Sequence, residues 1–117
     1  MGNPRRKPEK LPAKLLAIRQ KLGVSQSQMA TLLELETGYP RISEYEIGKR
    51  EPDLIILLRY TKLARVSIDV LANDSLELKF PKNWKRPKQV MDLLERQRHG
   101  RIQNRIDILR RQLSRSL

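Results

Sequence analysis

The chain of 117 residues has room for one domain with a modest core, carries a net charge of +12 and contains only 4% aromatic residues. The absence of Cys excludes disulfides and thiolate metal sites. No stretch approaches the roughly 18 apolar residues of a membrane span, and the opening MGNPRRKPEK lacks the apolar segment of a secretory signal. These features predict an aliphatic core and a cytoplasmic protein without a membrane anchor.

Residues 1–10 hold two Pro, one Gly and mixed charges, a composition typical of a disordered basic arm. A first helix is predicted next, because Pro12 suits the first helical turn and Gly23 suits a C-terminal stop. Its apolar residues have the spacing of one buried helical face: Leu11, Leu15, Ile18 and Leu22.

A second helix is predicted to follow after a tight turn. Ser25 can cap it, and Gln28, three residues later, completes a capping box. Only Gly23 and Val24 separate it from the first helix, which is the spacing of a helix–turn–helix. The apolar face of this second helix is expected to consist of Met29, Leu32 and Leu33.

A third helix is predicted over about residues 39–47. Either Thr37 or Gly38 serves as its N-cap, and Pro40 then falls in the first turn, where its missing N–H costs nothing. Gly48 is expected to end the helix. The side chains expected to face the core are Ile42 and Tyr45.

Two further helices complete the predicted domain. Asp53 is expected to cap a fourth helix, and Ser67 a short fifth helix over residues 67–72. Five helices without a strand pattern predict an all-α domain over residues 11–74. The buried face of the fourth helix is expected to consist of Leu54, Leu57, Leu58 and Thr61.

Residues 75–87 are predicted to be a linker, either a short extended segment or a tether laid on the domain, with Trp84 as its anchor. Residues 88–117 are predicted to form a basic amphipathic helix. Its apolar residues fall into two groups, Val90, Met91, Leu93 and Leu94, and then Ile102, Ile106, Leu109 and Leu113.

Basic residues concentrate at the two ends of the chain. Residues 1–10 hold four Lys or Arg against one acid, residues 11–80 ten against nine, and residues 81–117 eleven against three. This asymmetry favours a polyanionic partner, with nucleic acid ahead of a membrane surface. The alternative from charge alone is a soluble protein with charged tails.

Three stretches, in this order, carry a family resemblance. They are LLAIRQKLGVSQSQMATLL, RISEYEIGKREPDLIILLRYTKLA and VSIDVLA, and they extend over roughly residues 11–74. Their order and spacing resemble the lambda-repressor-like helix-turn-helix family, also called the Cro or xenobiotic-response-element (XRE) type. The resemblance implies a five-helix DNA-binding domain, followed here by a C-terminal basic helical segment. It also implies that the third helix is a recognition helix in the major groove of double-stranded DNA.

The resemblance assigns base contacts to the outward side chains of the third helix, Tyr39 among them. Arg41 can bind guanine bidentately, Glu44 can accept from a cytosine amino group, and Ser43 can do either. The alternative for Arg41 and Glu44 is a solvated ion pair on an exposed helix.

Other residues take their expected roles from the same resemblance. Gln26, Lys49 and Arg50 match positions that hold the DNA backbone in relatives. The alternatives are that Gln26 is only a polar first-turn residue and that the two basic residues neutralise a helix C-terminus. Arg19 and Glu46 match a largely buried, structural ion pair.

The sequence departs from the family pattern at two places. Eight residues separate Leu33 from Ile42, where six are common, and the longer turn carries Glu34 and Glu36. Arg65 stands where a Gly commonly ends the fourth helix, so either it adopts a left-handed conformation or the helix ends differently.

The C-terminal segment, residues 88–117, has three interpretations. It forms a coiled coil that makes a homodimer, or a basic arm that binds phosphates, or a helix that packs its apolar face on the domain. Its regular stripe spans only about two heptads, which is short for a coiled coil.

The leading functional hypothesis is a sequence-specific, double-stranded DNA-binding regulator of bacterial or phage transcription, such as a repressor. The alternative is an antitoxin-type DNA-binding protein whose C-terminal segment binds a toxin or another protein. An enzyme is not expected, because the single His99 lies in a polar basic stretch and no metal-ligand spacing or Gly-rich phosphate loop occurs. We expect no catalytic residue, cofactor or metal.

Overall fold

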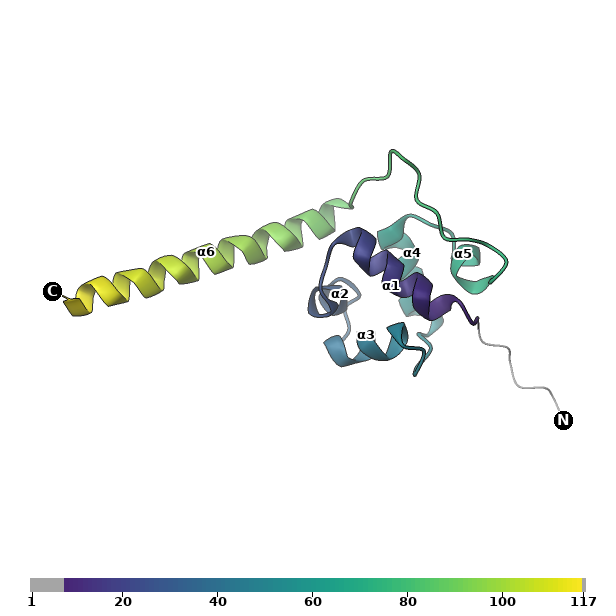
Figure 1. The fold of residues 1–117 in the computed structure, drawn as a ribbon, viewed down its shortest axis with the longest axis horizontal. Helices are drawn as coiled ribbons and strands as arrows, with labels where there is room; N and C mark the ends of the chain where they lie inside the picture. The colour runs from purple at the N-terminus through teal and green to yellow at the C-terminus, as the bar shows by residue number, and fades with distance from the viewer. Residues whose placement is uncertain (1–7, 117) are drawn as a thin grey trace. The chain divides into compact units, whose positions relative to one another are not determined.

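The computed structural model describes residues 8–116, and within them it contains six α-helices and no strand (Figure 1). The prediction of an all-α fold is therefore confirmed. The chain divides between Arg86 and Pro87 into two compact units, called here the N-terminal and C-terminal units. Of the predicted basic arm, residues 1–7 lie outside the described residues.

The N-terminal unit contains five short helices. Helix α1 contacts α3, α4 and α5, while α2 packs on α3 and α5 packs on α4. Together the five helices bury one shared aliphatic core. The bounds are α1 (Leu11–Leu22), α2 (Gln26–Leu32), α3 (Tyr39–Glu46), α4 (Leu54–Ala64) and α5 (Ile68–Ala72).

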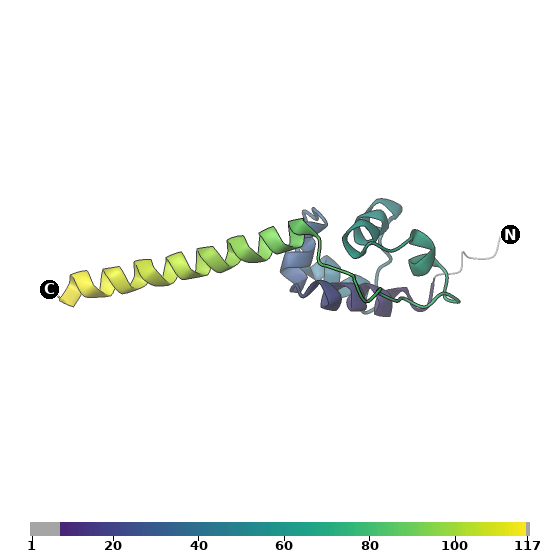
Figure 2. The same ribbon diagram turned by 90° about the horizontal axis from the view of Figure 1, so that it is seen from above.

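The C-terminal unit is a single helix, α6 (Lys88–Ser116). It is continuous through Gly100 and through the polar segment that separates its two apolar groups (Figure 2). The polar segment in the sequence therefore does not end the helix. The two apolar groups on either side of it lie on different faces of the same helix.

Side-chain hydrogen bonds cap two of the predicted helix starts, those of α2 and α4. Ser25 Oγ accepts from the Gln28 N–H at 3.1 Å, and Gln28 Oε1 accepts from the Ser25 N–H at 2.8 Å, which confirms the capping box. The Asp53 carboxylate accepts a first-turn N–H of α4 at 3.0 Å. Gly38 occupies the N-cap position of α3. Ser67 occupies that of α5 but makes no side-chain cap hydrogen bond.

Four helices end in the same arrangement. After each of α1 to α4, one residue has a left-handed backbone conformation. The backbone N–H of the residue that follows it donates to the carbonyl five residues earlier, as in a Schellman motif. Glycine adopts this conformation freely, whereas any other side chain costs about 1 kcal/mol. The left-handed residues are Gly23, Glu34, Gly48 and Arg65, with φ between 57° and 79°.

The core of the N-terminal unit is built as predicted on α1 and α3. Its members are aliphatic side chains and two tyrosines, Tyr45 and Tyr60. Every residue predicted to be inward on these two helices is buried: Leu11, Leu15, Ile18, Leu22, Ile42 and Tyr45.

The predicted buried face of α4 is wrong at two of its four residues, since Thr61 is buried and Leu57 is half-buried. Leu54 is 64% exposed and Leu58 is also exposed. The start of α4, LIILL, is apolar on every side, so the sequence allows two different buried faces, one that includes Leu54 and one that includes Ile56. The stripe from Ile56 continues to Tyr60 and Leu63 at helical spacing, and burial of the large Tyr60 ring decides between them. The residues of α4 that are buried are Ile56, Tyr60, Thr61, Leu63 and Ala64.

A buried lysine joins α1 to α5 and to the chain just after α5. Lys14 is 6% exposed, and its ammonium group donates to three backbone carbonyls at 2.7–3.0 Å. A lysine has three N–H donors, so this geometry satisfies all of them. The acceptors are the carbonyls of Val70, Asn73 and Leu76.

Asp74, which follows α5, also binds the start of α1. Its carboxylate accepts the backbone N–H of Glu9 at 2.9 Å and that of Lys10 at 3.0 Å, just ahead of α1. These two hydrogen bonds, from Lys10 first and then Glu9, hold the pKa of Asp74 below its ordinary value. The start of α1 and the end of α5 are thereby tied together.

Trp84 attaches the linker to the N-terminal unit. Its Nε1–H donates to the Ala64 carbonyl at 2.7 Å, which satisfies one of the open acceptors at the end of α4. Its ring meets Phe80 edge to face with centroids 5.3 Å apart. The ammonium of Lys21 lies 5.4 Å from the centroid of each ring.

Candidate nucleic-acid interface

Helix α3 has an anchored inner face and an exposed outer row. Ile42 and Tyr45 are buried in the core. Tyr39, Ser43 and Ile47 follow one another at intervals of four residues, so they lie along one line of the helix. Tyr39 is exposed, Ser43 is partly exposed and Ile47 is 70% exposed. The helix therefore presents a hydroxyl group between two large side chains to the solvent.

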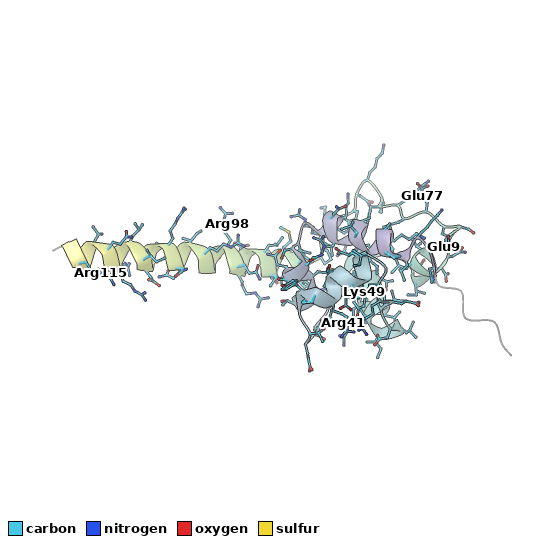
Figure 3. The ribbon with its side chains drawn as sticks, turned by 60° about the horizontal axis from the view of Figure 1, so that its bottom comes forward. Glu9, Arg41, Lys49, Glu77, Arg98 and Arg115 are labelled. Atoms are coloured by element: carbon cyan, nitrogen blue, oxygen red, sulfur yellow. The ribbon has the colours of Figure 1, made fainter. Side chains whose placement is uncertain are left out.

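Basic side chains flank this outer row at both ends. Arg41 lies in the first turn of α3 and Lys49 just past its last turn (Figure 3). Among the described residues, neither makes a side-chain hydrogen bond or an ion pair. Both are thus available to an anionic partner.

Glu44 and Arg50 are bound to each other. Arg50 Nε donates to Glu44 Oε2 at 2.8 Å. This hydrogen bond, more than the nearby positive charges, holds the pKa of Glu44 below its ordinary value, so the carboxylate stays ionised. The backbone N–H groups of Lys49 and Arg50 also donate to the Glu44 carbonyl, which fixes the turn after α3.

A buried carboxylate fixes α3 against the two helices before it. Glu46, whose side chain is 5% exposed, accepts from Arg19 Nε at 2.6 Å and Nη2 at 3.0 Å. It also accepts from Gln26 Nε2 at 3.1 Å, and Arg19 Nη1 donates to the Val24 carbonyl at 3.1 Å. Residues of α1, α2, α3 and the turn between α1 and α2 therefore meet at one charge-assisted cluster.

Comparison with known proteins gave one match, which lies within the N-terminal unit. Residues 15–71 match the family model described as helix-turn-helix. These residues form a lambda-repressor-like helix-turn-helix domain. The domain is of the type found in DNA-binding regulators. Neither curated proteins nor solved structures gave a match to the chain.

The structure places the predicted contact residues in two settings. Tyr39, Arg41, Ser43 and Lys49 lie on the surface at α3. The remaining ones already have protein partners: Glu44 and Arg50 bind each other, and Gln26 binds Glu46. Their assignment as DNA contacts stays a prediction. Sequence reasoning missed Ile47 as a surface residue, although its four-residue spacing from Ser43 and Tyr39 was visible.

The longer turn of the helix-turn-helix domain directs one of its two acids toward α4. Glu34 Oε2 lies 3.7 Å from Arg59 Nη2, and Arg59 Nη1 donates to the Leu33 carbonyl at 2.8 Å. Arg59 therefore partly neutralises this turn and holds its backbone. Glu36 is exposed.

The described residues contain no group of three or more His, Cys, Asp or Glu side chains that could hold a metal ion. His99 Nε2 lies 3.6 Å from Glu95 Oε1 one turn earlier on α6, and both side chains are exposed. Within residues 8–116, no helix has the length and apolar character needed to span a bilayer.

Proposed function

We propose that the protein binds specific sequences of double-stranded DNA through α3 in the major groove and regulates transcription. The observation that carries this proposal is the two-sided character of α3. Its inner side is fixed by two core residues and by the Glu46 cluster, while Tyr39, Ser43 and Ile47 form an open row outside. A rigid helix with an open polar and apolar face is what reading of base edges requires.

Base readout is assigned to the outer row and Arg41. The guanidinium of Arg41 can donate two hydrogen bonds to guanine, and Ser43 can donate or accept. Ile47 adds an apolar contact suited to a thymine methyl group. Glu44 can accept from cytosine only after it releases Arg50, so that contact would cost an existing ion pair.

Phosphate contacts are assigned to residues at the edges of α3. Lys49 is exposed beside its end, and the Arg50 guanidinium, oriented by Glu44, has further N–H groups. Gln26 donates one amide N–H to Glu46, and the second N–H of the same amide can donate to a phosphate oxygen. Such contacts position the protein, whereas the base contacts give specificity.

The test begins with selection from a random pool of double-stranded DNA. The selected site and a scrambled site are then titrated at low and moderate salt. We expect a preference of about a thousandfold or more for the selected site. Arg41→Ala should relax the preference at one position, whereas Lys79→Ala, whose partner Glu77 is 3.6 Å away in the linker, should leave it unchanged. Equal binding to both sites, lost with salt, would contradict the proposal.

A further inference from the structure

Helix α6 exposes an aliphatic stripe in its second half. Ile102, Ile106, Leu109 and Leu113 are between 38% and 66% exposed. Their spacing of four, three and four residues is that of the a and d positions of a coiled coil. Exposed aliphatic side chains in such a register favour burial against another helix. These four residues are called the α6 stripe below.

Arginines border the α6 stripe on both sides. In the heptad register of the stripe, Arg98 and Arg105 occupy g positions and Arg110 an e position. The other bordering positions are held by glutamines, and no acid stands among them. Asp107, the acid within this span, occupies a b position away from the stripe and accepts a hydrogen bond from Gln103 at 3.1 Å.

This charge pattern disfavours pairing with a second copy of α6. In a parallel pair, Arg105 of one helix faces Arg110 of the other, and in an antiparallel pair cationic borders also face each other. Like charges at e and g positions oppose association and select against wrong partners. DNA would satisfy the arginines but would leave the aliphatic stripe exposed to water.

We propose that residues 98–115 are a docking surface for an acidic amphipathic helix of another protein. The partner helix carries aliphatic side chains at its a and d positions and Glu or Asp at its e and g positions. The stripe supplies buried apolar area, and Arg98, Arg105 and Arg110 select the acidic partner and its register. The proposal is independent of DNA readout by α3, because it involves only residues of the C-terminal unit.

The experiment uses the full chain and two labelled synthetic helices of three heptads. Both have Leu and Ile at a and d; one has Glu at e and g, the other Lys. In fluorescence anisotropy titrations, the Glu peptide should bind at least about tenfold more tightly than the Lys peptide, and added salt should reduce the difference. Sedimentation of the free chain should show a monomer at the same concentrations.

Three variants identify the surface. Ile106→Asp with Leu109→Asp should abolish binding of the Glu peptide. Ile108→Asp, an equally drastic change at a residue that is 46% exposed but off the stripe, should leave binding unchanged. Arg105→Glu with Arg110→Glu should invert the preference toward the Lys peptide, an outcome that simple loss of the helix cannot produce.

Three results would overturn the proposal. The first is equal binding of the two peptides. The second is a dimer of the free chain that Ile106→Asp dissociates, because the occupant would then be a second copy. The third is no peptide binding together with weaker binding of scrambled DNA by the Arg105→Glu and Arg110→Glu variant, because the segment would then be a nucleic-acid arm.

Discussion

The N-terminal unit and α6 obtain their helices in different ways. Each helix of the N-terminal unit has 12 residues or fewer, and such helices are marginal alone. They persist because caps, a shared core, the Glu46 cluster and the buried Lys14 hold them. Helix α6 has 29 residues, and from Arg98 to Arg115 its side chains are exposed apart from Asp107. Disturbing tertiary contacts should therefore damage the first unit and spare the second.

The largest effect is expected at Glu46. Glu46→Ala removes the acceptor of Arg19 and Gln26 and leaves Arg19, whose side chain is only 18% exposed, without its counter-ion. We expect a loss of about 3–5 kcal/mol in the free energy of unfolding, measured by urea denaturation. Lys79→Ala, which breaks an ion pair exposed on both sides, is the control and should change it by less than about 1 kcal/mol. A loss of that small size for Glu46→Ala would contradict the role of this cluster.

A slightly smaller effect is expected at Lys14. Lys14→Met keeps the buried hydrocarbon chain but leaves three backbone carbonyls without their donor. The free energy of unfolding should fall by about 2–3 kcal/mol in the same assay. Lys62→Met, at an exposed site on α4, should change it little. Equal values for the two variants would show that the joint between α1 and α5 adds nothing.

A gain of stability is expected at the non-glycine helix ends. Arg65 and Glu34 are left-handed with φ of 57°, so Arg65→Gly and Glu34→Gly should each relieve strain of about 1 kcal/mol. Thermal unfolding would show this as a higher Tm. Gly48→Ala is the opposite control and should lower the Tm. It places a side chain on a residue with φ of +79°, and its Cβ would lie 3.3 Å from Pro12 Cγ. A lower Tm for Arg65→Gly would mean that contacts of the Arg65 side chain stabilise the fold by more than the strain of its left-handed backbone destabilises it.

The effect at Gly100 should be confined to α6. A Cβ added there meets no atom within 4 Å other than the nearby backbone of α6 itself, so Gly100→Ala should stabilise the helix by about 0.5–1 kcal/mol. Circular dichroism should show more helix at elevated temperature, while the urea midpoint of the N-terminal unit stays the same. A shift of that midpoint would contradict an effect confined to α6.

The smallest effect is expected from acid. The pKa of Asp74 is lowered in the folded state, so its contribution to stability is present above the ordinary value of 3.8. It is lost as the pH falls through that value and then through the lowered pKa. Asp74→Asn should flatten this part of the stability profile in urea titrations between pH 5 and 2. An unchanged profile would show that the amides of Glu9 and Lys10 do not favour the carboxylate.

The sequence was most informative where structure depends on neighbours along the chain. The capping box at Ser25, the cap at Asp53 and the stops at Gly23 and Gly48 involve partners within six residues, and each was predicted. The prediction failed on α4, because a segment apolar on all sides has no marked inner face and packing decides it.

Contacts between distant residues also escaped prediction. Lys14 meets carbonyls more than 50 residues away, and nothing in its local sequence marks it as buried. The resemblance assigns Gln26 to a phosphate contact, but it does not indicate that the Gln26 amide donates a hydrogen bond to Glu46. The resemblance implies an ion pair between Glu46 and Arg19, but it does not imply that Gln26 joins them.

The most direct test of the account compares the two units on DNA. The selected and scrambled sites are titrated with the wild type, with Arg41→Ala, and with Arg105→Glu plus Arg110→Glu. We predict that Arg41→Ala weakens binding to the selected site by about tenfold to a hundredfold and barely affects the scrambled site. The α6 variant should leave the ratio of the two affinities unchanged. An unchanged ratio for Arg41→Ala, or a ratio lost with the α6 variant, would contradict base readout by α3.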